Sequence, residues 1–367
     1  MIRAHKIRLY PNDKQATYFA KACGTARFAY NWALNEWKLA HEAGENVSEA
    51  ELRKRLNAVK HAEYPWMSEV TKCAPQLAIK NGLHNAIRNY YAKRAGFPKF
   101  RKKGVRDSFS LSNDQFALEG QAIRIPLLGW VRMAEALRFD GKIVGAAISR
   151  RADHWFVAVQ VEVAEPMSAH ARENQASGVD LGIRALATLS DGTVIPGAKA
   201  GRACEKKLRR LNQELSRRQG AKKGEEKSKN FRKTQKKLNR LYARMANVRS
   251  DQTHKLTSML TQNYGLIGIE DLNVRGMMSN HRLARSVADM SFFEFRRQLE
   301  YKAAAANGRV IVADQWFPSS KMCHICGTKV EDLDLSVREW VCGQCGARHD
   351  RDLNASINLR NYAIQSA

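Results

Sequence analysis

Two Cys-x-x-Cys pairs near the carboxyl end constrain the fold of this chain more than any other feature. Cys323 and Cys326 form the first pair, and after a spacer of fifteen residues Cys342 and Cys345 form the second. Each short pair presents two thiolates from one turn, and the spacer is long enough for a small hairpin that brings the pairs together. The spacing predicts a tetrahedral zinc site. Four thiolates fill the coordination shell, so this Zn²⁺ would be structural rather than catalytic.

The residues around these pairs support the zinc interpretation. Gly327 and Gly346 each follow the second cysteine of a pair, where a tight turn needs glycine. His324 and His349 could compete as ligands, but their spacing fits less well. Four free thiols in a core are the alternative without metal. The chain has seven cysteines, an odd number that favours metal over disulfides, and three of them are scattered: Cys23, Cys73 and Cys204.

The charge balance predicts a polyanionic partner. The formal net charge is +26, and the region 202–246 alone holds 17 Lys or Arg against four Glu. Charge of one sign at this density repels itself in a compact fold unless a polyanion offsets it. A solvated basic surface and an anionic membrane are the alternatives, but no amphipathic terminal helix with bulky apolar anchors accompanies the charge. Nucleic acid is the expected partner.

Membrane insertion and secretion are not expected. No apolar run approaches the roughly 20 residues of a membrane-spanning helix. The first residues, MIRAHKIRLYPNDK, carry charges where a signal peptide needs an apolar core. We therefore expect a cytoplasmic location.

The first part of the chain has helical patterning after one short strand at 6–12. The first helix is expected to break near Gly24, and Ser48 with Glu51 predicts a capping box at the start of the second. A third helix is predicted over 76–96, with an apolar stripe that suits a helix-bundle core.

Strand patterning follows a basic loop at 96–107. Short strands are predicted at 108–114, 122–133, 142–150 and 155–163. Together with the first strand they indicate a small β-barrel or sandwich interrupted by the helical block. The stretch 164–178 resembles a linker.

After Ser177 the pattern becomes α/β. GVDLGIRALATLSDGTVI predicts two strands around a turn at 190–192, and buried strands are predicted at 264–272 and 308–314. The basic region 202–246 predicts a helical hairpin with one leucine-rich seam and a loop at 220–230. A further helix is predicted over 290–307.

Three acidic residues are candidates for chemistry. Asp180 lies inside an apolar strand, Glu270 ends another, and Asp352 lies at the start of the last helix. Buried carboxylates need partners, and an oxygen-rich cluster is what Mg²⁺ prefers. Two such ions about 4 Å apart could clamp a phosphodiester and activate water. Asp350 competes with Asp352, and we favour Asp350 as the helix cap and Asp352 as the ligand.

Structural roles remain open for each acid taken alone. Asp180 could be a salt-bridged strand residue, and Glu270 or Asp271 could cap the next turn.

Several segments together resemble the TnpB family of transposon-encoded RNA-guided DNA nucleases, which is related to the compact type V CRISPR effectors. The resemblance covers essentially the whole chain and is carried by RLYPNDKQ, GVDLGIRALATLSDG, GIEDLNVRGM, FPSSKMCHICG and CGQCGARHDRDLNASINL. The last segment has DLNAS where DxNAA is commoner in the family.

The resemblance implies a multidomain α+β fold. An N-terminal wedge β-barrel with an inserted helical recognition bundle would precede a C-terminal RNase H-like (RuvC) α/β domain with an inserted four-cysteine zinc ribbon. The implied boundaries are 1–12 for the first barrel strand, 13–95 for the helical insert, 96–170 for the remaining barrel and linker, and 171–367 for the nuclease domain, with the ribbon at 317–348.

The resemblance also implies an activity. The protein would be an RNA-guided, Mg²⁺- or Mn²⁺-dependent DNA endonuclease that cuts beside a short adjacent motif, with Asp180, Glu270 and Asp352 as the catalytic metal ligands. Its partners would be a guide RNA from the transposon end and double-stranded target DNA. We expect a monomer on its RNA in the prokaryotic cytosol or nucleoid, without a membrane partner.

A set of basic and polar residues is predicted to touch nucleic acid. By similar placement, Lys72 and Gln76 are candidates for reading the adjacent motif, since Gln suits adenine and Lys suits guanine or phosphate. Helix-start residues without a ligand are the alternative. The other candidates lie in the basic loop and the helical hairpin: Lys99, Arg101, Lys102, Lys103, Arg209, Arg210, Lys236 and Lys237.

Other functions fit the sequence less well. A catalytically idle RNA-guided binder would have a broken acidic set. A single-strand transposase would need a His-x-His metal pair, and none of the ten histidines lies two residues from another. A simple transcription factor would not need acids embedded in strands.

Overall fold

The computed structural model describes residues 1–164, 175–219, 227–334 and 336–367. The chain divides into two compact units, Met1–Ala164 and Glu165–Ala367, and each is described here by itself. Most of the predicted linker at 164–178 and of the predicted loop at 220–230 lies outside the described residues. Within the described ranges, no helix is long and apolar enough to cross a membrane.

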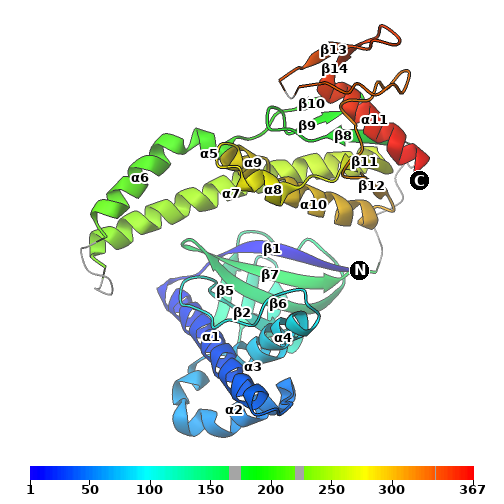
Figure 1. Cartoon of the computed structure of the whole chain (residues 1–367). Helices are drawn as coiled ribbons and strands as arrows, with labels where there is room; N and C mark the ends of the chain where they lie inside the picture. Colours follow the sequence, from blue (N-terminus) through cyan, green and yellow to red (C-terminus); the bar gives the residue numbers. More distant parts are fainter. Residues whose placement is uncertain (165–174, 220–226, 335) are drawn as a thin grey trace. The chain divides into compact units, whose positions relative to one another are not determined.

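The first unit is built on a seven-stranded antiparallel sheet with the order β2-β6-β7-β1-β5-β4-β3 (Figure 1). The first strand of the chain lies inside this sheet, between two strands that follow more than a hundred residues later. Buried and exposed residues alternate along β7, as expected for a strand with one face on a core. The strands are β1 (Ile2–Tyr10), β2 (Ser108–Ser112), β3 (Ala117–Glu119), β4 (Ala122–Ile125), β5 (Gly129–Met133), β6 (Lys142–Arg151) and β7 (His154–Glu162).

The first helix contradicts one prediction. α1 (Asp13–Glu42) runs through Gly24 without a break, because a long apolar face of this helix is buried and offsets the low helix propensity of one glycine. Its start carries a capping box that the sequence analysis missed, in which Asn12 and Gln15 exchange hydrogen bonds of 2.9 and 3.0 Å. At α2 (Glu49–Glu63) the Ser48 hydroxyl accepts from the Glu51 backbone, as predicted.

The predicted third helix is divided, and this prediction is wrong in detail. A short 3₁₀ turn at Pro65–Glu69 precedes α3 (Cys73–Leu77), which continues through a π-helical turn at Ala78–Leu83 into α4 (His84–Tyr91). Within the π turn, a Cβ on Gly82 would lie 2.9 Å from the guanidinium of Arg101. That guanidinium stacks 3.7 Å from the ring centre of Tyr30. Tertiary packing against the basic loop therefore accompanies the wider helical turn.

The second unit has a five-stranded sheet with the order β10-β9-β8-β11-β12. β8 (Ala176–Asp180), β11 (Leu266–Glu270) and β12 (Arg309–Ala313) are parallel, whereas β9 (Ala187–Leu189) and β10 (Val194–Ile195) are antiparallel to their neighbours. The predicted turn at 190–192 joins β9 and β10. The segment expected to form two strands thus forms three.

Helices cover both faces of this sheet (Figure 1). α7 (Lys229–Asn263) and α10 (Phe292–Ala305) bury leucines and phenylalanines against Val179, Ile267 and Ile269 on one face. The opposite face meets α11 (Arg351–Gln365). The shorter helices are α5 (Ala200–Ala203), α8 (Val274–Ser279) and α9 (Ala284–Met290).

The predicted helical hairpin is confirmed. α6 (Glu205–Arg217) lies along α7, and one apolar cluster joins them (Figure 1). Its members on the two helices are the predicted seam: Leu208, Leu211, Leu215, Leu238, Leu241 and Met245. The charged residues of the hairpin are left outside this seam.

Two glycines allow α11 to lie directly on the sheet. A Cβ on Gly178 of β8 would be 1.9 Å from the carbonyl oxygen of Ser356, and one on Gly268 of β11 would be 2.2 Å from the carbonyl oxygen of Leu359. Backbone atoms cannot yield as a flexible side chain can. Glycine is therefore required at both positions for this close approach.

We predict opposite effects for the same substitution at two glycines. Gly178→Ala should destabilise the second unit by about 1–3 kcal/mol or more, since α11 must move off β8. Gly24→Ala should stabilise α1 by roughly 0.5–1 kcal/mol, because the added methyl improves helix propensity and meets only the Arg27 guanidinium, at an ordinary contact distance of 3.9 Å. Hydrogen exchange of α11 and α1 amides in the full chain measures both effects. Unchanged protection of α11 in Gly178→Ala would contradict the packing argument.

Candidate functional site

The parallel strands bring two acidic residues to one edge of the sheet. The register pairs Val179 of β8 with Ile269 of β11, so Asp180 and Glu270 follow side by side at the carboxyl ends. Strand alternation puts both on the face of Gly178 and Gly268, which is the face covered by α11.

The last helix supplies the third acid. Asp350 is the N-cap of α11, and its side chain accepts a 2.9 Å hydrogen bond from the Leu353 backbone. Asp352 lies in the first turn, one turn before Ser356, whose carbonyl oxygen lies over Gly178. Asp350 therefore caps the helix, as predicted. Asp352 lies on the helix face toward the sheet, and its role as a cation ligand stays a prediction.

The three carboxylates influence one another electrostatically. Burial raises the pKa of Asp180 well above its usual value, and the negative charges of Glu270 and Asp352 raise it further. Burial also raises the pKa of Glu270, whereas a hydrogen bond from the Ser319 hydroxyl and the charge of Arg351 lower it. A cation at this site would relieve the repulsion among the three groups.

Two arginines oppose this negative charge. Arg338 Nη1 lies 3.3 Å from Asp352 Oδ1. Arg351 is buried, and its Nη1 donates to the carbonyl oxygen of Asp334 at 2.7 Å. Neither arginine was predicted from the sequence, nor was Ser319, because nothing in their local pattern points to an acid that is distant along the chain.

A second candidate metal site lies in the ribbon. The Sγ atoms of Cys323, Cys326, Cys342 and Cys345 all lie within 4.8 Å of one another, and among the described residues this is the group of His, Cys, Asp and Glu side chains that meets that limit. The Sγ–Sγ separations are 3.7 Å for the first and last cysteine and 3.6 Å for the middle two. A Zn–S bond of about 2.3 Å implies a tetrahedral edge of about 3.8 Å. The cluster therefore fits Zn²⁺.

The two cysteine pairs form nearly identical turns. In each turn, the backbone carbonyl of the first cysteine accepts a 2.9 Å hydrogen bond from the N–H of the glycine four residues later. The N–H of the same cysteine donates a 2.9 Å hydrogen bond to the carbonyl five residues later. Gly327 and Gly346 have φ angles of +76° and +71°, which explains why glycine follows each pair. The second turn is closed by β13 (Glu339–Val341) and β14 (Arg348–Asp350), and the first by one bridge between Met322 and Lys329.

Two histidines, His324 and His349, lie beside the cysteine cluster. His349 Nε2 lies 3.1 Å from Cys323 Sγ, and its ring packs against Trp340 at 4.5 Å. His324 Nδ1 faces Asn354 Oδ1 at 3.0 Å. Four sulfurs would complete the shell of a tetrahedral ion, so neither histidine is needed as a ligand.

The predicted nucleic-acid residues occupy three surfaces. Lys99, Lys102 and Lys103 are exposed on the basic loop, while Arg101 in the same loop stacks on Tyr30. The hairpin exposes four more of the predicted residues: Arg209, Arg210, Lys236 and Lys237.

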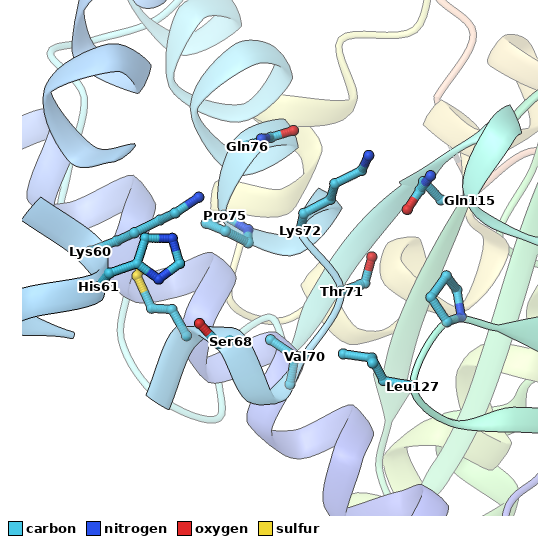
Figure 2. A pocket seen from close by; sticks show the side chains of 12 residues that line it. Lys60, His61, Ser68, Val70, Thr71, Lys72, Pro75, Gln76, Gln115 and Leu127 are labelled. Atoms are coloured by element: carbon cyan, nitrogen blue, oxygen red, sulfur yellow. The ribbon is translucent and has the colours of Figure 1, made fainter. Parts of the chain in front are cut away.

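The third surface is a hollow in the first unit (Figure 2). Lys72 is exposed and Gln76 half-buried beside a pocket of about 360 Å³. Figure 2 shows Lys72 and Gln76 on the same side of this pocket as Gln115, which comes from the turn after β2. Lys60 and His61 of α2 also line the pocket. The sequence analysis did not identify Gln115, Lys60 or His61, because only the fold brings them beside Lys72.

Comparisons with known proteins identify relatives along the whole chain. Residues 157–281 match a family described as "Probable transposase", residues 292–359 match "Cas12f1-like, TNB domain", and residues 1–46 match "Helix-turn-helix domain". In this structure, residues 1–46 contain β1 and α1 rather than two successive helices.

Individual relatives match over nearly the full length. A Streptomyces pristinaespiralis protein named "Putative RNA-guided DNA endonuclease" is 36% identical over 369 residues, which cover 97% of this chain and 88% of that protein. InsQ of Escherichia coli K12, with the same description, is 30% identical over 98% of this chain and 91% of its own. The mimivirus "TnpB-like protein L79" is 29% identical over 36% of this chain and 27% of its own.

A solved structure shares the fold. The chain titled "Cryo-EM structure of the Cas12f1-sgRNA-target DNA complex" matches with a TM-score of 0.58 at 11% identity, covering 98% of this chain and 99% of that one. At this identity the likeness concerns the fold alone.

We predict that the ribbon depends on zinc. Cys323→Ser should remove bound zinc and expose the ribbon to proteolysis, because three thiolates cannot hold the tetrahedral ion as four do. Cys204→Ser is the matched control, since Cys204 lies outside the cluster at the start of α6. Metal analysis of the purified proteins decides the point. Stoichiometric zinc in Cys323→Ser would contradict the assignment.

Proposed function

Since this chain belongs to the TnpB family, we propose that it is an RNA-guided DNA endonuclease whose cleavage centre is formed by Asp180, Glu270 and Asp352. One observation carries this proposal. Acids that are 90 and 82 residues apart in sequence end two adjacent parallel strands and begin the helix that lies on the same sheet face. An arrangement that only stabilised the fold would not gather three mutually repelling carboxylates.

The donor set of this centre suits a hard divalent cation. All three side chains offer oxygen, which favours Mg²⁺ or Mn²⁺ over zinc. When bound, such ions activate a water molecule and neutralise charge on the phosphate in two-metal hydrolysis. Asp180 and Glu270 would hold the cations from the rigid strand ends, and Asp352 from the helix start. Arg338 and Arg351 would limit the repulsion among these acids.

The proposed activity is supported by the sheet of the second unit. Its mixed order, with parallel strands that end in acids and helices on both faces, suits an RNase H-like nuclease domain. We further propose that the seven-stranded sheet of the first unit acts as the wedge barrel, that the helical insert at 13–95 is the recognition bundle, and that 317–348 is the zinc ribbon.

Exposed basic side chains would hold the guide RNA and the target DNA. The basic loop and the α6–α7 hairpin concentrate positive charge on surfaces away from their apolar contacts. Contacts of this kind bind phosphate by charge and shape, without reading bases. Base pairing with the RNA would then select the target.

The hollow in Figure 2 is the proposed reader of the adjacent motif. A glutamine amide can make two hydrogen bonds to the major-groove edge of adenine, and a lysine can bond guanine or phosphate. Lys72 and Gln76 offer these groups together beside an open pocket.

Neutralising each of two nearby aspartates should give different results. Asp352→Asn should lower target cleavage by roughly 10³-fold, equivalent to about 4 kcal/mol, because a cation ligand is lost. Asp350→Asn should leave cleavage near wild type, since asparagine caps a helix as well as aspartate. The assay is single-turnover cleavage with purified protein and its co-purified RNA, in Mg²⁺ or Mn²⁺.

Guided DNA binding provides the control for that comparison. Asp180→Ala, Glu270→Ala and Asp352→Asn should all keep RNA-directed target binding while losing cleavage. Retained cleavage in any one of them would remove that residue from the centre. A wild-type protein that binds the guided target but never cuts it would favour an idle RNA-guided binder.

Reading of the adjacent motif can be separated from phosphate binding. Gln76→Ala should relax base preference next to the target, at a cost of about 1–3 kcal/mol for the preferred base. Lys237→Ala should weaken binding to all target sequences equally. It should also reduce the slope of log affinity against log salt concentration by about one. Cleavage of a library with randomised flanking bases measures the base preference, and target binding at several salt concentrations measures the salt dependence. An unaltered base preference in Gln76→Ala would exclude this residue as a reader.

A further inference from the structure

Ser319 connects the ribbon segment to the proposed cleavage centre. It lies between β12 and the first cysteine pair and is 3% exposed. Its hydroxyl donates a hydrogen bond to Glu270 Oε1, which is 49 residues away in sequence. A buried hydroxyl that bonds a charged oxygen restricts that carboxylate to one rotamer.

Two buried asparagines on α11 hold Ser319 in place. Asn354 and Asn358 are one helical turn apart and are 1% and 2% exposed. Asn358 Nδ2 donates to the carbonyl oxygens of Ser319 at 2.8 Å and of Met322 at 2.6 Å. Asn354 Nδ2 donates to the same two oxygens at 3.4 and 2.8 Å. The segment 319–322 is therefore clamped at both ends by one face of α11.

The clamp also reaches the first cysteine turn. Asn354 Oδ1 accepts from the His324 backbone at 3.1 Å, so it engages residues on both sides of Cys323. All the hydrogen-bonding groups of the Asn354 side chain are thereby used. A leucine of similar size could fill this space. A leucine would make no hydrogen bond to the Ser319 and Met322 carbonyls. The two buried amides do, and they thereby fix the positions of these carbonyls.

We propose that Ser319 is a positioning residue for Glu270, and that Asn354 and Asn358 join it to the ribbon, so that the zinc-bound turn and the cleavage centre form one hydrogen-bonded unit. This inference rests on the proposed function of Glu270 as a cation ligand. The Ser319 hydroxyl engages Oε1 of Glu270, and Oε2 would be the oxygen that holds a cation. Asp352, on the same helix as the two asparagines, is kept in register with Glu270 by the same clamp.

The test compares two adjacent serines in the full chain bound to its RNA. Ser319→Ala removes the hydroxyl that reaches Glu270. Ser320→Ala is the matched control, because it makes the same chemical change at the neighbouring half-buried position. Ser319→Thr retains a hydroxyl and serves as the conservative variant. Mn²⁺ binding is measured directly from the electron paramagnetic resonance of free Mn²⁺, with Asp352→Asn defining the ions bound elsewhere, including on the RNA.

We expect Ser319→Ala to weaken Mn²⁺ binding and to raise the Mn²⁺ concentration for half-maximal cleavage, each by roughly 10–100-fold. Cleavage at saturating Mn²⁺ should recover most of its rate. Zinc content and guided DNA binding should equal those of Ser320→Ala, and Ser319→Thr should restore part of the Mn²⁺ affinity.

Two results would overturn the proposal. Equal Mn²⁺ affinity in Ser319→Ala and Ser320→Ala would exclude positioning of Glu270. Loss of zinc in Ser319→Ala with normal Mn²⁺ affinity would assign Ser319 to ribbon packing alone. Failure of the proposed function itself would look different: Asp352→Asn would then bind Mn²⁺ and cut like the wild type, and the positioning role would fall with it.

Discussion

Direct backbone contact between α11 and the sheet is the constraint on which the second unit depends. Gly178 and Gly268 leave no side chain between the helix and strands β8 and β11. Each lies two residues before an acid on the same strand, so Asp180 and Glu270 point to the same face as the glycines. The helix that rests on that face carries Asp352 one turn earlier. Any larger side chain at either glycine would move α11 away and separate the acids that this contact brings together.

The negative charges of the three acids act on one another, and two arginines of the same unit oppose them. Arg351 is buried and also bonds a ribbon carbonyl, while Arg338 approaches Asp352 from the segment before β13. Arg351, the first residue of α11, therefore joins that helix to the segment that also carries Arg338. Together with Ser319, they make the ribbon part of the environment of the acids. The four-cysteine cluster is a separate candidate metal site, whose four sulfurs would fill a tetrahedral shell.

The sequence predictions succeeded where the determining interactions are local. The cysteine spacing and the glycines that follow it match two turns closed by their own backbone bonds, and Asp350 caps α11 within three residues. They failed where distant packing decides the backbone. The helical break expected at Gly24 does not occur because tertiary burial sustains α1, and the helix expected at 76–96 widens at Gly82 to meet Arg101.

The sequence by itself determined which groups are candidates for chemistry: two thiolate pairs, three acids near strand or helix ends, and a strong positive charge. These depend on residue type and short spacing, which the chain carries from residue to residue. Only the tertiary structure decided which groups meet. Parallel pairing of β8 with β11, the face on which α11 lies, and the reach of Ser319 to Glu270 all join residues far apart in sequence. Such long-range contacts depend on how whole helices and strands pack. A local sequence pattern does not specify which distant element will pack against it.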